Sequence, residues 1–556
     1  MDNPGRDDLL RWKDDKPSNY YAAVPSLETT LESRMGTRFS DELRKKLDDF
    51  GRVVATEIEP SVQLIEQNRQ FPKLHSYDEV GQHVERIEFH PASVDAGRAT
   101  WASGMLATPL NYEGAFELAG HFFLLSHVGE GGQACAVVCT IGLRRALERR
   151  ASEKLKSTYL DGLMESDTTT ALRGSQFLTE IQGGSDVGAT LTVASPDSVI
   201  PDAWRVSGEK WFCSVADADL FAVIARPAGA ADGTKGLACF LVPRTLDGIT
   251  PNGFRIRRLK DKLGTRGLAS GEIDFENALA YPIGEFDEGF NIAVSELLNT
   301  SRWLNAVGST GIMSRAYIEA STFAHHRNAF GTAIENLDAV RDQLAVMKIE
   351  VEAALASTML LTELVGKIDE GTASSEETKF HRFLVNANKY VTSITATSVV
   401  HSAIEVLGGN GTIEDFSPLP RLYRDSIVFE SWEGTHNVLC AQVHRDCARL
   451  SLLDTVFRWI NSELTELQTA SGAVGALICR AAEQLEPSIR KAVDATSLTP
   501  AEFRTQLTDL TRIIQAVCLL TCSDDAVVAA FVHRYLSMVE LNGGPAIHQY
   551  FHESAD

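Results

Sequence analysis

Two periodicities of apolar residues, one typical of strands and one typical of helices, alternate along this chain. Their order constrains the fold more than any other feature. Between residues 203 and 275, short alternating runs of apolar residues are separated by turn signals such as Asp232-Gly233 and Asn252-Gly253. This pattern predicts a small antiparallel β domain. Helical periodicity precedes it up to about Leu172 and returns at Gly289. We therefore expect a mainly α-helical protein with one small antiparallel β domain.

The same periodicities predict the individual elements. The expected strands are 204–206, 210–212, 220–225, 237–242, 254–259 and 272–275. Long helices joined by short polar links predict an antiparallel four-helix bundle, with helices at about 290–330, 338–370, 375–407 and 430–450. The predicted division is a loosely structured N-terminal arm (1–40), a helical domain (41–174), the β domain (175–288), the bundle (289–450) and a C-terminal helical extension (451–556).

Charge and composition limit the classes of partner. The 556 residues carry a formal net charge of −23, and residues 451–556 contain 7 basic against 13 acidic residues. Nucleic-acid phosphates would be repelled by this average field, so DNA binding is not expected. No uninterrupted apolar run reaches the ~18 residues that suggest a membrane span, and the acidic N-terminus does not resemble a signal peptide.

The nine cysteines predict reduced thiols in the cytoplasm, because they contain no paired CxxC motif. Cys135 with Cys139, and Cys518 with Cys522, have a spacing of four residues in apolar surroundings. This spacing favours packing inside helices over metal ligation, so no metal site is expected.

The stretch 179–187 reads Thr-Glu-Ile-Gln-Gly-Gly-Ser-Asp-Val. Glycine allows a backbone to approach a ligand closely, and Thr179, Ser185 and the loop amides could donate hydrogen bonds to a flat polar ring or a phosphate. Taken alone, the stretch is equally consistent with an ordinary polar turn.

Three further segments give this stretch a context. They are 208–214 (GEKWFCS), 327–331 (RNAFG), and the series 405–411 (EVLGGNG), 421–425 (RLYRD) and 431–437 (SWEGTHN). In this order and at these distances, over about residues 115–450, the chain resembles the acyl-CoA dehydrogenase family. The resemblance implies an α-helical domain, a β domain and a C-terminal four-helix bundle that hold FAD at their junction.

The N-terminal region resembles the AidB-like branch of that family, the alkylation-response flavoproteins. The residues that carry this resemblance are 77–81 (YDEVG) and 87–92 (IEFHPA). The N-terminal arm, Trp432 before Glu433, and the roughly one hundred residues after the bundle are similar to the same branch.

The resemblance implies α,β-dehydrogenation of an acyl-CoA thioester in fatty acid metabolism. A base removes the α-proton while a hydride leaves the β-carbon for flavin N5, and such a base is a carboxylate in a dry pocket. Glu433 matches the usual position of the base, and its main-chain N–H with a flavin ribityl hydroxyl would hold the thioester carbonyl. In some relatives the base occupies the position of Ser301, which carries no carboxylate. The alternative for Glu433 is an ordinary carboxylate at a helix start.

The resemblance also implies a set of FAD contacts. Arg327 and Phe330 match residues that reach the FAD of a neighbouring subunit, which implies a homotetramer, and electron-transfer flavoprotein is the expected electron acceptor. Trp211 matches a tryptophan packed on the flavin, although an aromatic residue in a strand is more often plain core. The matched positions are Thr179, Gly184, Ser185, Trp211, Phe212, Ser214, Arg327, Phe330, Gly408, Gly409, Thr435 and Asn437.

The chain departs from the family pattern at several positions. Cys213 stands where a threonine is common, and could alter flavin reactivity or fill space. Glu405 replaces a glutamine before the diphosphate loop. Arg302 matches an arginine that places CoA, but its usual aspartate partner is Asn299 here. Arg302 is equally consistent with a cation on a helix surface.

Three functions are therefore weighed. The first is an FAD-dependent acyl-CoA dehydrogenase with Glu433 as base and with Arg302 and Ser301 near the substrate. The second is an AidB-like flavoprotein with another role, either in alkylation damage and DNA-associated protection or as an oxidase or monooxygenase. The third is a catalytically silent homologue, against which the intact Glu433 argues.

Overall fold

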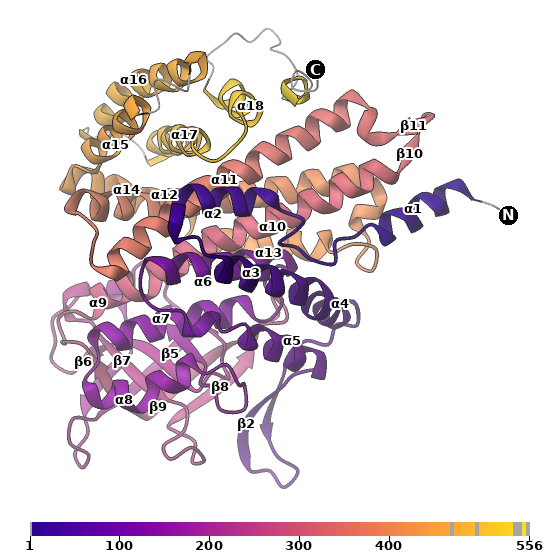
Figure 1. Ribbon diagram of the computed structural model, residues 1–556. Coiled ribbons are helices and arrows are strands. Elements are labelled where there is room, and N and C mark those ends of the chain that lie inside the picture. The colour runs from indigo at the N-terminus through magenta and orange to yellow at the C-terminus, as the bar shows by residue number, and fades with distance from the viewer. Residues whose placement is uncertain (1–2, 467–471, 495–499, 537–546, 552–556) are drawn as a thin grey trace. The chain divides into compact units, whose positions relative to one another are not determined.

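The computed structural model describes residues 3–466, 472–494, 500–536 and 547–551, and its chain divides into two compact units (Figure 1). The first unit comprises residues 1–56, 109–129 and 305–556. The second comprises residues 57–108 and 130–304. Each unit is assembled from segments that are distant in sequence. The five-segment division remains a prediction.

The first unit is built mainly from helices. Its elements are α1 (Pro4–Asp14), α2 (Pro25–Met35), α3 (Asp41–Val53), α6 (Tyr112–Leu125), α10 (Asn299–His326, from residue 305 onwards), the two-residue strands β10 (Asn328–Ala329) and β11 (Thr332–Ala333), α11 (Asp338–Glu370), α12 (Ser375–Leu407), α13 (Leu419–Ser431), α14 (His436–Leu450), α15 (Leu452–Glu466), α16 (Gly472–Asp494), α17 (Pro500–Leu519) and α18 (Asp525–Tyr535).

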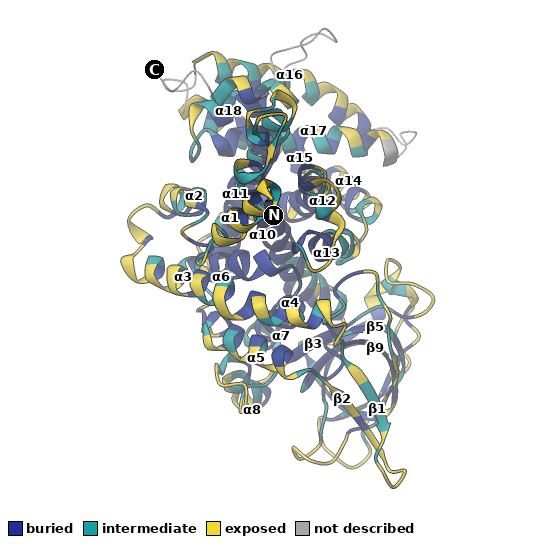
Figure 2. Ribbon diagram, turned by 90° about the vertical axis from the view of Figure 1, so that its right-hand side faces the viewer, coloured by how far each residue is buried: buried dark blue, intermediate teal, exposed yellow. Residues whose placement is uncertain are grey.

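Two 33-residue helices, α11 and α12, form the centre of this unit, and both are buried over most of their length (Figure 2). A capping box starts α12, with Ser374 and Glu377 satisfying each other's backbone N–H groups. Apolar residues of α10, α11, α12 and α13 share one core. The four long helices predicted from the sequence are thus present, but the one expected over 430–450 is wrong at its start. Its place is taken by α13 and α14, which are separated at 432–435.

The prediction of a loosely structured arm is also wrong, because Pro4–Asp14 forms α1 and Pro25–Met35 forms α2. Trp12, Leu27 and Leu31 are buried. Each of the two helices has proline at its first position, where the missing N–H costs nothing. The polar composition of the segment concealed these helices, since each buries only one face.

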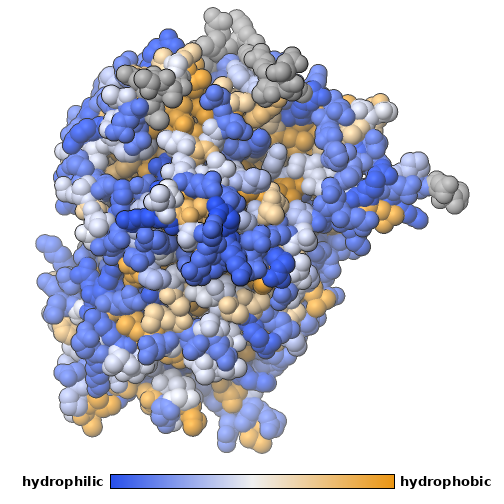
Figure 3. All heavy atoms as spheres, in the orientation of Figure 1, coloured by the Kyte–Doolittle hydropathy of each residue, from blue (hydrophilic) through white to orange (hydrophobic). Residues whose placement is uncertain are grey.

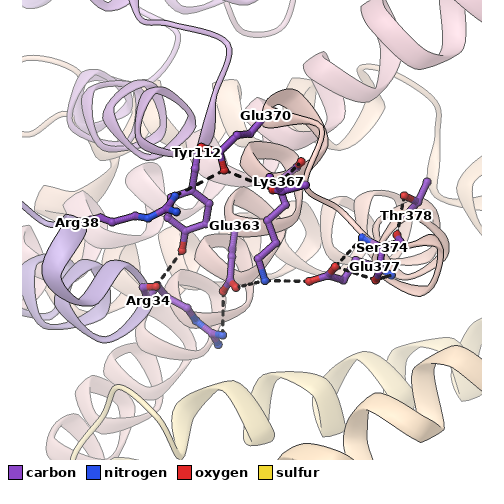
Figure 4. Close-up of polar contacts among 10 residues, drawn as sticks. Arg34, Arg38, Tyr112, Glu363, Lys367, Glu370, Ser374, Glu377 and Thr378 are labelled. Atoms are coloured by element: carbon purple, nitrogen blue, oxygen red, sulfur yellow. Dashed lines mark hydrogen bonds and ion pairs between the residues drawn. The ribbon is translucent and has the colours of Figure 1, made fainter.

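Ion pairs fasten the end of α2 to the central helices (Figure 4). Arg34 lies 3.5 Å from Glu363 of α11, and the Tyr112 hydroxyl donates to the Arg34 carbonyl at 3.0 Å. Lys367 continues the network to Glu363 at 2.8 Å and to Glu377 of α12 at 2.9 Å. The N-terminal helices are therefore an integral part of the first unit.

The predicted C-terminal helical extension is present as α15–α18. Arg512 of α17 forms a two-pronged ion pair with Glu350 of α11, at 2.6 and 3.1 Å. Tyr390 of α12 shares a hydrogen bond with Thr508 of α17 at 3.0 Å. The extension thus packs on the same central helices as the N-terminal segment.

The surface and the hydropathy of the helices bear on membrane insertion. On the face drawn in Figure 3, hydrophobic residues are scattered among hydrophilic ones. Within the described residues one helical stretch, Ser375–Thr412, is long and apolar enough to cross a membrane, and 56% of its most apolar window is buried. A buried core helix passes the same test, so this stretch is weak evidence for a span.

The second unit combines helices with a β-sheet. Its elements are α4 (Glu59–Gln67), β1 (Lys73–Tyr77), β2 (His83–Glu88), α5 (Pro91–Ala102), α7 (Ala134–Arg150), α8 (Glu153–Met164), β3 (Gly174–Phe177), β4 (Val193–Pro196), β5 (Trp204–Ser214), β6 (Leu220–Pro227), β7 (Ala238–Pro243), β8 (Phe254–Leu259), β9 (Ser270–Ile283) and α9 (Gly289–Ile292).

The sheet closes on itself. The path β6–β4–β5–β9–β7 returns to β6 by a further pairing of β6 with β7. Most pairs are antiparallel, as predicted, whereas β6 pairs in parallel with β3 and β4. The predicted strands 204–206 and 210–212 are one strand, β5, which bulges beside Gly208. Closure buries one face of β5 inside the barrel, and this decides which of its side chains point outward.

The hairpin β1–β2 interrupts a region that the sequence predicts to be helical. Its connection contains Asp78 and Gly81, which are ordinary turn signals. Glu85 of β2 accepts a hydrogen bond from the Ile256 main-chain N–H of β8 at 2.8 Å. The prediction of helix throughout 41–172 is therefore wrong for residues 73–88.

Candidate functional site

In the second unit, the loop that follows β3 carries the first predicted flavin contacts. Thr179 is half-buried, while Gly184 and Ser185 are exposed. A Cβ at Gly184 would lie 2.5 Å from the Thr179 Oγ1 atom. A side chain at position 184 would therefore force the Thr179 side chain to move.

Strand β5 lies directly against this loop. The Trp211 main-chain N–H donates to the Thr179 carbonyl at 2.9 Å. Phe212 is 54% exposed, and Ser214, at the end of the strand, accepts a hydrogen bond from Ser175. The structure thus brings Thr179, Trp211, Phe212 and Ser214 together on neighbouring segments of one unit.

Lys260 lies above the aromatic pair, and the sequence did not predict it. Its Nζ atom lies 3.6 Å from the centre of the Trp211 ring and 4.6 Å from that of Phe212. The same ammonium forms an ion pair with Glu272 at 2.8 Å. A cation over these rings adds positive charge where an electron-rich ligand would stack. The basic run 255–260 was the only available signal.

A buried ion pair lies beneath the same loop and strand. Glu180 and Lys210 are 2% and 1% exposed, and their carboxylate and ammonium are 2.7 Å apart. Burial alone would raise the pKa of Glu180, but the Lys210 charge and hydrogen bonds from Thr192 and Leu191 lower it to about 2. Because Glu180 follows Thr179 and Lys210 precedes Trp211, the pair fixes both predicted flavin contacts.

Cys213 is fully buried, in contrast to the exposed Phe212 beside it. Burial raises the pKa of the Cys213 thiol well above its usual range. A protonated thiol inside the barrel fills space and is a poor nucleophile. The space-filling interpretation of this departure from the family pattern is therefore favoured.

Arg302 and Ser301 occupy the first turns of α10, in the part that belongs to the second unit. They are 3% and 2% exposed. The Gln176 amide of β3 donates to the Ser301 hydroxyl at 2.8 Å. The alternative that Arg302 is a cation on a helix surface is therefore wrong.

A cavity of about 250 Å³ lies next to the C-terminal end of β5 within the second unit. Val215 and Asp217, which follow Ser214, form part of its wall. Trp101, Gln133 and Leu268 also line it. The cavity approaches the size of a small-molecule pocket and is lined mainly by apolar side chains.

In the first unit, Glu433 lies in the connection between α13 and α14 rather than inside a helix. Its φ is +58° and that of Gly434 is +107°. A positive φ is unfavourable for a residue with a side chain, so this conformation needs support from its surroundings. Glu433 is half-buried. Glu433 lies two residues before Thr435, the N-cap of α14, so a solvated or salt-bridged carboxylate at a helix start stays the alternative to a catalytic base.

Lys389 supplies that support. It is fully buried on α12, and its Nζ donates to the carbonyls of Glu430 at 2.8 Å and Gly434 at 3.1 Å. The Glu430 carbonyl belongs to the last turn of α13, where carbonyls lack helical partners and a cation is favourable. The two contacts bracket Glu433 from both sides.

The Glu430 side chain extends the support to the start of α14. Its carboxylate accepts hydrogen bonds from Thr397 and, at 2.8 Å, from His436. Burial opposes ionisation, but these two donors lower the pKa of Glu430. The sequence analysis missed Lys389 and Glu430. A lysine between the apolar Val385 and Val391 was the signal that could have identified the first.

The remaining predicted FAD contacts of this unit are exposed. Thr435 precedes α14, and the Asn437 side chain accepts a hydrogen bond from Arg504 of α17 at 3.2 Å. Gly408 has a φ of +61°, and a Cβ on Gly408 or Gly409 would meet nothing within 4 Å. These two glycines leave an open backbone surface beside the end of α12.

Arg327 and Phe330 lie on the β10–β11 hairpin at the end of α10. Phe330 is 94% exposed at its tip, with a φ of +54°. Glu405, near the glycine pair, accepts a hydrogen bond from Gln343 at 2.8 Å. The hairpin thus presents an aromatic side chain to the solvent of the isolated chain.

No cluster of metal-ligating side chains was found within the described ranges. All nine cysteines are free thiols, and the Sγ atoms of Cys135 and Cys139 are 3.8 Å apart inside α7.

Three family models match successive parts of the chain. The N-terminal domain of the adaptive response protein AidB matches residues 16–167. The middle and C-terminal domains of acyl-CoA dehydrogenase match residues 175–278 and 287–448. The Escherichia coli protein AidB is 32% identical over 393 residues, which cover 67% of this chain and 69% of that protein.

This chain belongs to the acyl-CoA dehydrogenase family.

Solved structures of the family agree with the fold. Caenorhabditis elegans ACDH-11, in complex with C11-CoA, has a TM-score of 0.85 at 25% identity, covering 95% of this chain and 90% of that one. A Bacillus anthracis acyl-CoA dehydrogenase complexed with FAD has a TM-score of 0.68 at 20% identity, covering 93% and 85%. Members of this flavoprotein family bind FAD, and the AidB-like assignment of the N-terminal region is confirmed.

The three family models do not match residues 1–15, which contain α1, or residues 449–556, which contain α15–α18. Both segments nevertheless contact residues at, or next to, predicted site positions. Arg504 of α17 contacts Asn437, and Asp8 of α1 contacts Asn328 of the Arg327 hairpin.

Proposed function

We propose that this protein is an FAD-dependent acyl-CoA dehydrogenase that forms a double bond between the α and β carbons of an acyl-CoA thioester. The observation that carries the proposal is the conformation of the 432–435 connection. An otherwise unfavourable φ at Glu433 is held by the buried Lys389. Such local strain is retained where the surrounding structure fixes a side chain for a task.

Glu433 acts as the base in this proposal. Its carboxylate takes the proton from the α-carbon, and its main-chain N–H holds the thioester carbonyl oxygen and stabilises the charge that develops there. Glycine at position 434 allows the chain to pass close to the substrate. The Lys389 contacts keep the carboxylate and the main-chain N–H in one fixed relation.

The residues present are compatible with FAD. Thr179, Ser185 and the neighbouring amides would hold the polar edge of the ring, and Trp211 would pack on it, with Phe212 and Ser214 along the same edge. The open backbone at Gly408 and Gly409 has room for a diphosphate, with Thr435 and Asn437 on the adenosine side. When bound, FAD supplies the acceptor for the hydride from the β-carbon.

The proposed assembly is a homotetramer in which Arg327 and Phe330 reach the cofactor of a neighbouring subunit. The exposure of Phe330 at the hairpin tip is compatible with this assembly, because it leaves the aromatic ring available to a neighbouring subunit. Electron-transfer flavoprotein is the proposed acceptor of the electrons.

The proposed substrate is an acyl-CoA of intermediate chain length, by analogy with the C11-CoA bound to the C. elegans relative. The buried Arg302 would help place the CoA moiety, and Ser301 lies next to it in the same helix.

Anaerobic reduction of the flavin by a series of acyl-CoAs tests this function. We expect bleaching of the flavin absorbance by at least one of them, and a decrease in its rate on the order of 10²- to 10⁴-fold in Glu433→Gln. Glu414→Gln, which neutralises an exposed carboxylate of the same unit, is the matched control. If no acyl-CoA reduced the wild-type flavin, the dehydrogenase proposal would be wrong.

The second candidate is a protective role in alkylation damage, favoured by the match of residues 16–167 to AidB. The acidic charge of residues 451–556 argues against direct DNA binding. Retention on duplex DNA at about 150 mM salt, where weak nonspecific contacts fade, would favour this second role.

A further inference from the structure

Helix α1 lies against the hairpin that carries Arg327 and Phe330. Its N-cap is Asn3, whose side chain accepts the Gly5 N–H at 3.1 Å, and Pro4 follows as the first helical residue. Trp12 is 4% exposed, stacks on Phe416 at 4.8 Å and meets Phe323 of α10 edge-on at 5.6 Å. These aromatic contacts fix the helix to the core of the first unit.

One turn before Trp12, on the same face, the Asp8 carboxylate binds the first strand of the hairpin. It accepts the main-chain N–H of Asn328 at 2.9 Å and the Asn328 side-chain amide at 3.1 Å. Asp8 is 5% exposed, and Arg11 of its own helix donates to it at 2.6 Å. Hydrogen bonds to a buried carboxylate are among the stronger ones in proteins.

Two further contacts hold the approach to the hairpin. His326, the last residue of α10, lies 2.9 Å from the Asp15 carboxylate just after α1. The Arg327 guanidinium lies 4.0 Å from Asp8, and a Cβ at Gly5 would come within 3.1 Å of it. Residues 326, 327 and 328 are thus each contacted by α1 or its C-terminal end.

We propose that α1 is a strut that positions the Arg327–Phe330 hairpin for its contact with the cofactor of a second copy of this chain. Asp8 is the positioning residue, acting through Asn328 and Arg327. The inference rests on the proposed function, in which those two hairpin residues reach a neighbouring FAD. It also gives a role to residues 1–15, which the family models do not match.

The physical argument is one of preorganisation. A two-residue β-ladder has little stability of its own, because each pair of strands this short is marginal in water. If the hairpin were held only by its own backbone, docking on a partner would have to order it at an entropic cost. The Asp8 contacts hold the hairpin in one conformation within the isolated chain. Docking on a second subunit therefore carries no further entropic cost for ordering it.

The test compares the dissociation constant of FAD and the subunit assembly of Asp8→Asn with those of the wild-type holoenzyme. We expect FAD to bind about tenfold more weakly in Asp8→Asn, as expected for loss of a charge-assisted hydrogen bond. The Asp8→Asn tetramer should also dissociate at protein concentrations at which the wild-type tetramer stays intact. Asp7→Asn removes the same charge from an exposed position of the same helix and should change neither property.

A double-mutant cycle separates positioning from general stability. If Asp8 acts through Arg327, the loss in FAD affinity in Asp8→Asn combined with Arg327→Ala should be close to that of Arg327→Ala alone. A fully additive loss would overturn the proposal, as would an unchanged FAD affinity in Asp8→Asn. If Asp8→Asn folds poorly, Gly5→Val, which crowds Arg327 but keeps the carboxylate, should weaken FAD binding by itself.

The outcome for Arg327→Ala alone distinguishes a failure of the proposed function from a failure of the strut proposal. If this variant bound FAD as tightly as the wild type, the contact between subunits in the proposed function would be wrong. If Arg327→Ala weakened FAD binding and Asp8→Asn did not, only the strut would be wrong.

Discussion

A buried lysine supports the predicted site in each unit, and the two lysines do so differently. In the barrel, Lys210 pairs with a carboxylate, Glu180, and both groups are almost completely buried. In the helical unit, Lys389 donates to two main-chain carbonyls at the end of α13 and beyond it. The first arrangement fixes a wall on which a ring can stack. The second fixes one strained turn that carries a single carboxylate.

The difference has an energetic consequence. Breaking a buried ion pair leaves an uncompensated charge, which is costly wherever it lies. Removing a cation from carbonyls leaves neutral groups, which cost less but lose their orientation. We therefore expect damage to Lys210 to appear mainly in folding and cofactor binding, and damage to Lys389 to appear mainly in turnover.

The largest effect is expected for Lys210→Met. This variant leaves the Glu180 carboxylate buried without its cation, which should lower the free energy of unfolding by about 3 to 5 kcal/mol. Chemical denaturation of the apoprotein measures it, with the exposed Lys235→Met of the same barrel as control. An unfolding midpoint equal to that of the control would remove the distinction between the two lysines.

The next effect is a dependence of stability on pH. Glu180 has a folded pKa of about 2, whereas an unfolded glutamate titrates near pH 4.3. The unfolded chain therefore binds more protons between these values, and the contribution of Glu180 is complete above about pH 5 and lost as pH falls toward 2. The difference corresponds to about 3 kcal/mol.

The free energy of unfolding measured between pH 7 and pH 3 checks this expectation. Glu180→Gln should be less stable than the wild type at pH 7 and should show a shallower slope with pH. Equal slopes for the two proteins would mean that other carboxylates dominate acid unfolding.

The smallest effect on stability is expected for Lys389→Met, at about 2 kcal/mol. The variant should be recognised mainly by its catalysis, with kcat lowered on the order of tenfold or more while the flavin spectrum and FAD affinity stay near those of the wild type. Lys379→Met, on the same helix and 43% exposed, is the control. A change confined to KM would indicate that Lys389 does not hold the base.

Much of the fold could be predicted from periodicity and turn chemistry. The strands around Phe240 and the long helices follow directly from alternation and from the 3.6-residue repeat. The helix break at 432–435 was missed, although Gly434 and the N-cap residue Thr435 both mark it. The N-terminal helices were missed although Pro4 and Pro25 mark their starts, since polar composition was given more weight than capping signals.

The predicted site residues could be identified from the order of the sequence motifs. The residues that support them could be identified only from the folded structure. Glu180 and Lys210 are thirty positions apart, and only barrel closure brings them into contact. Lys389 reaches the carbonyls of Glu430 and Gly434 because α12 and α13 pack together. Contacts of this kind depend on register between distant segments, which a single sequence does not specify.

The contact between Arg504 and Asn437 links the C-terminal region to a predicted cofactor residue. Arg504 also donates to the Tyr390 hydroxyl at 3.0 Å, and the Tyr390 ring lies against His436. A genetic screen for loss of flavin binding should therefore recover substitutions near residue 504, some seventy positions from the nearest family motif. Such alleles would have the phenotype of an active-site lesion while mapping to a segment that the family models leave unmatched.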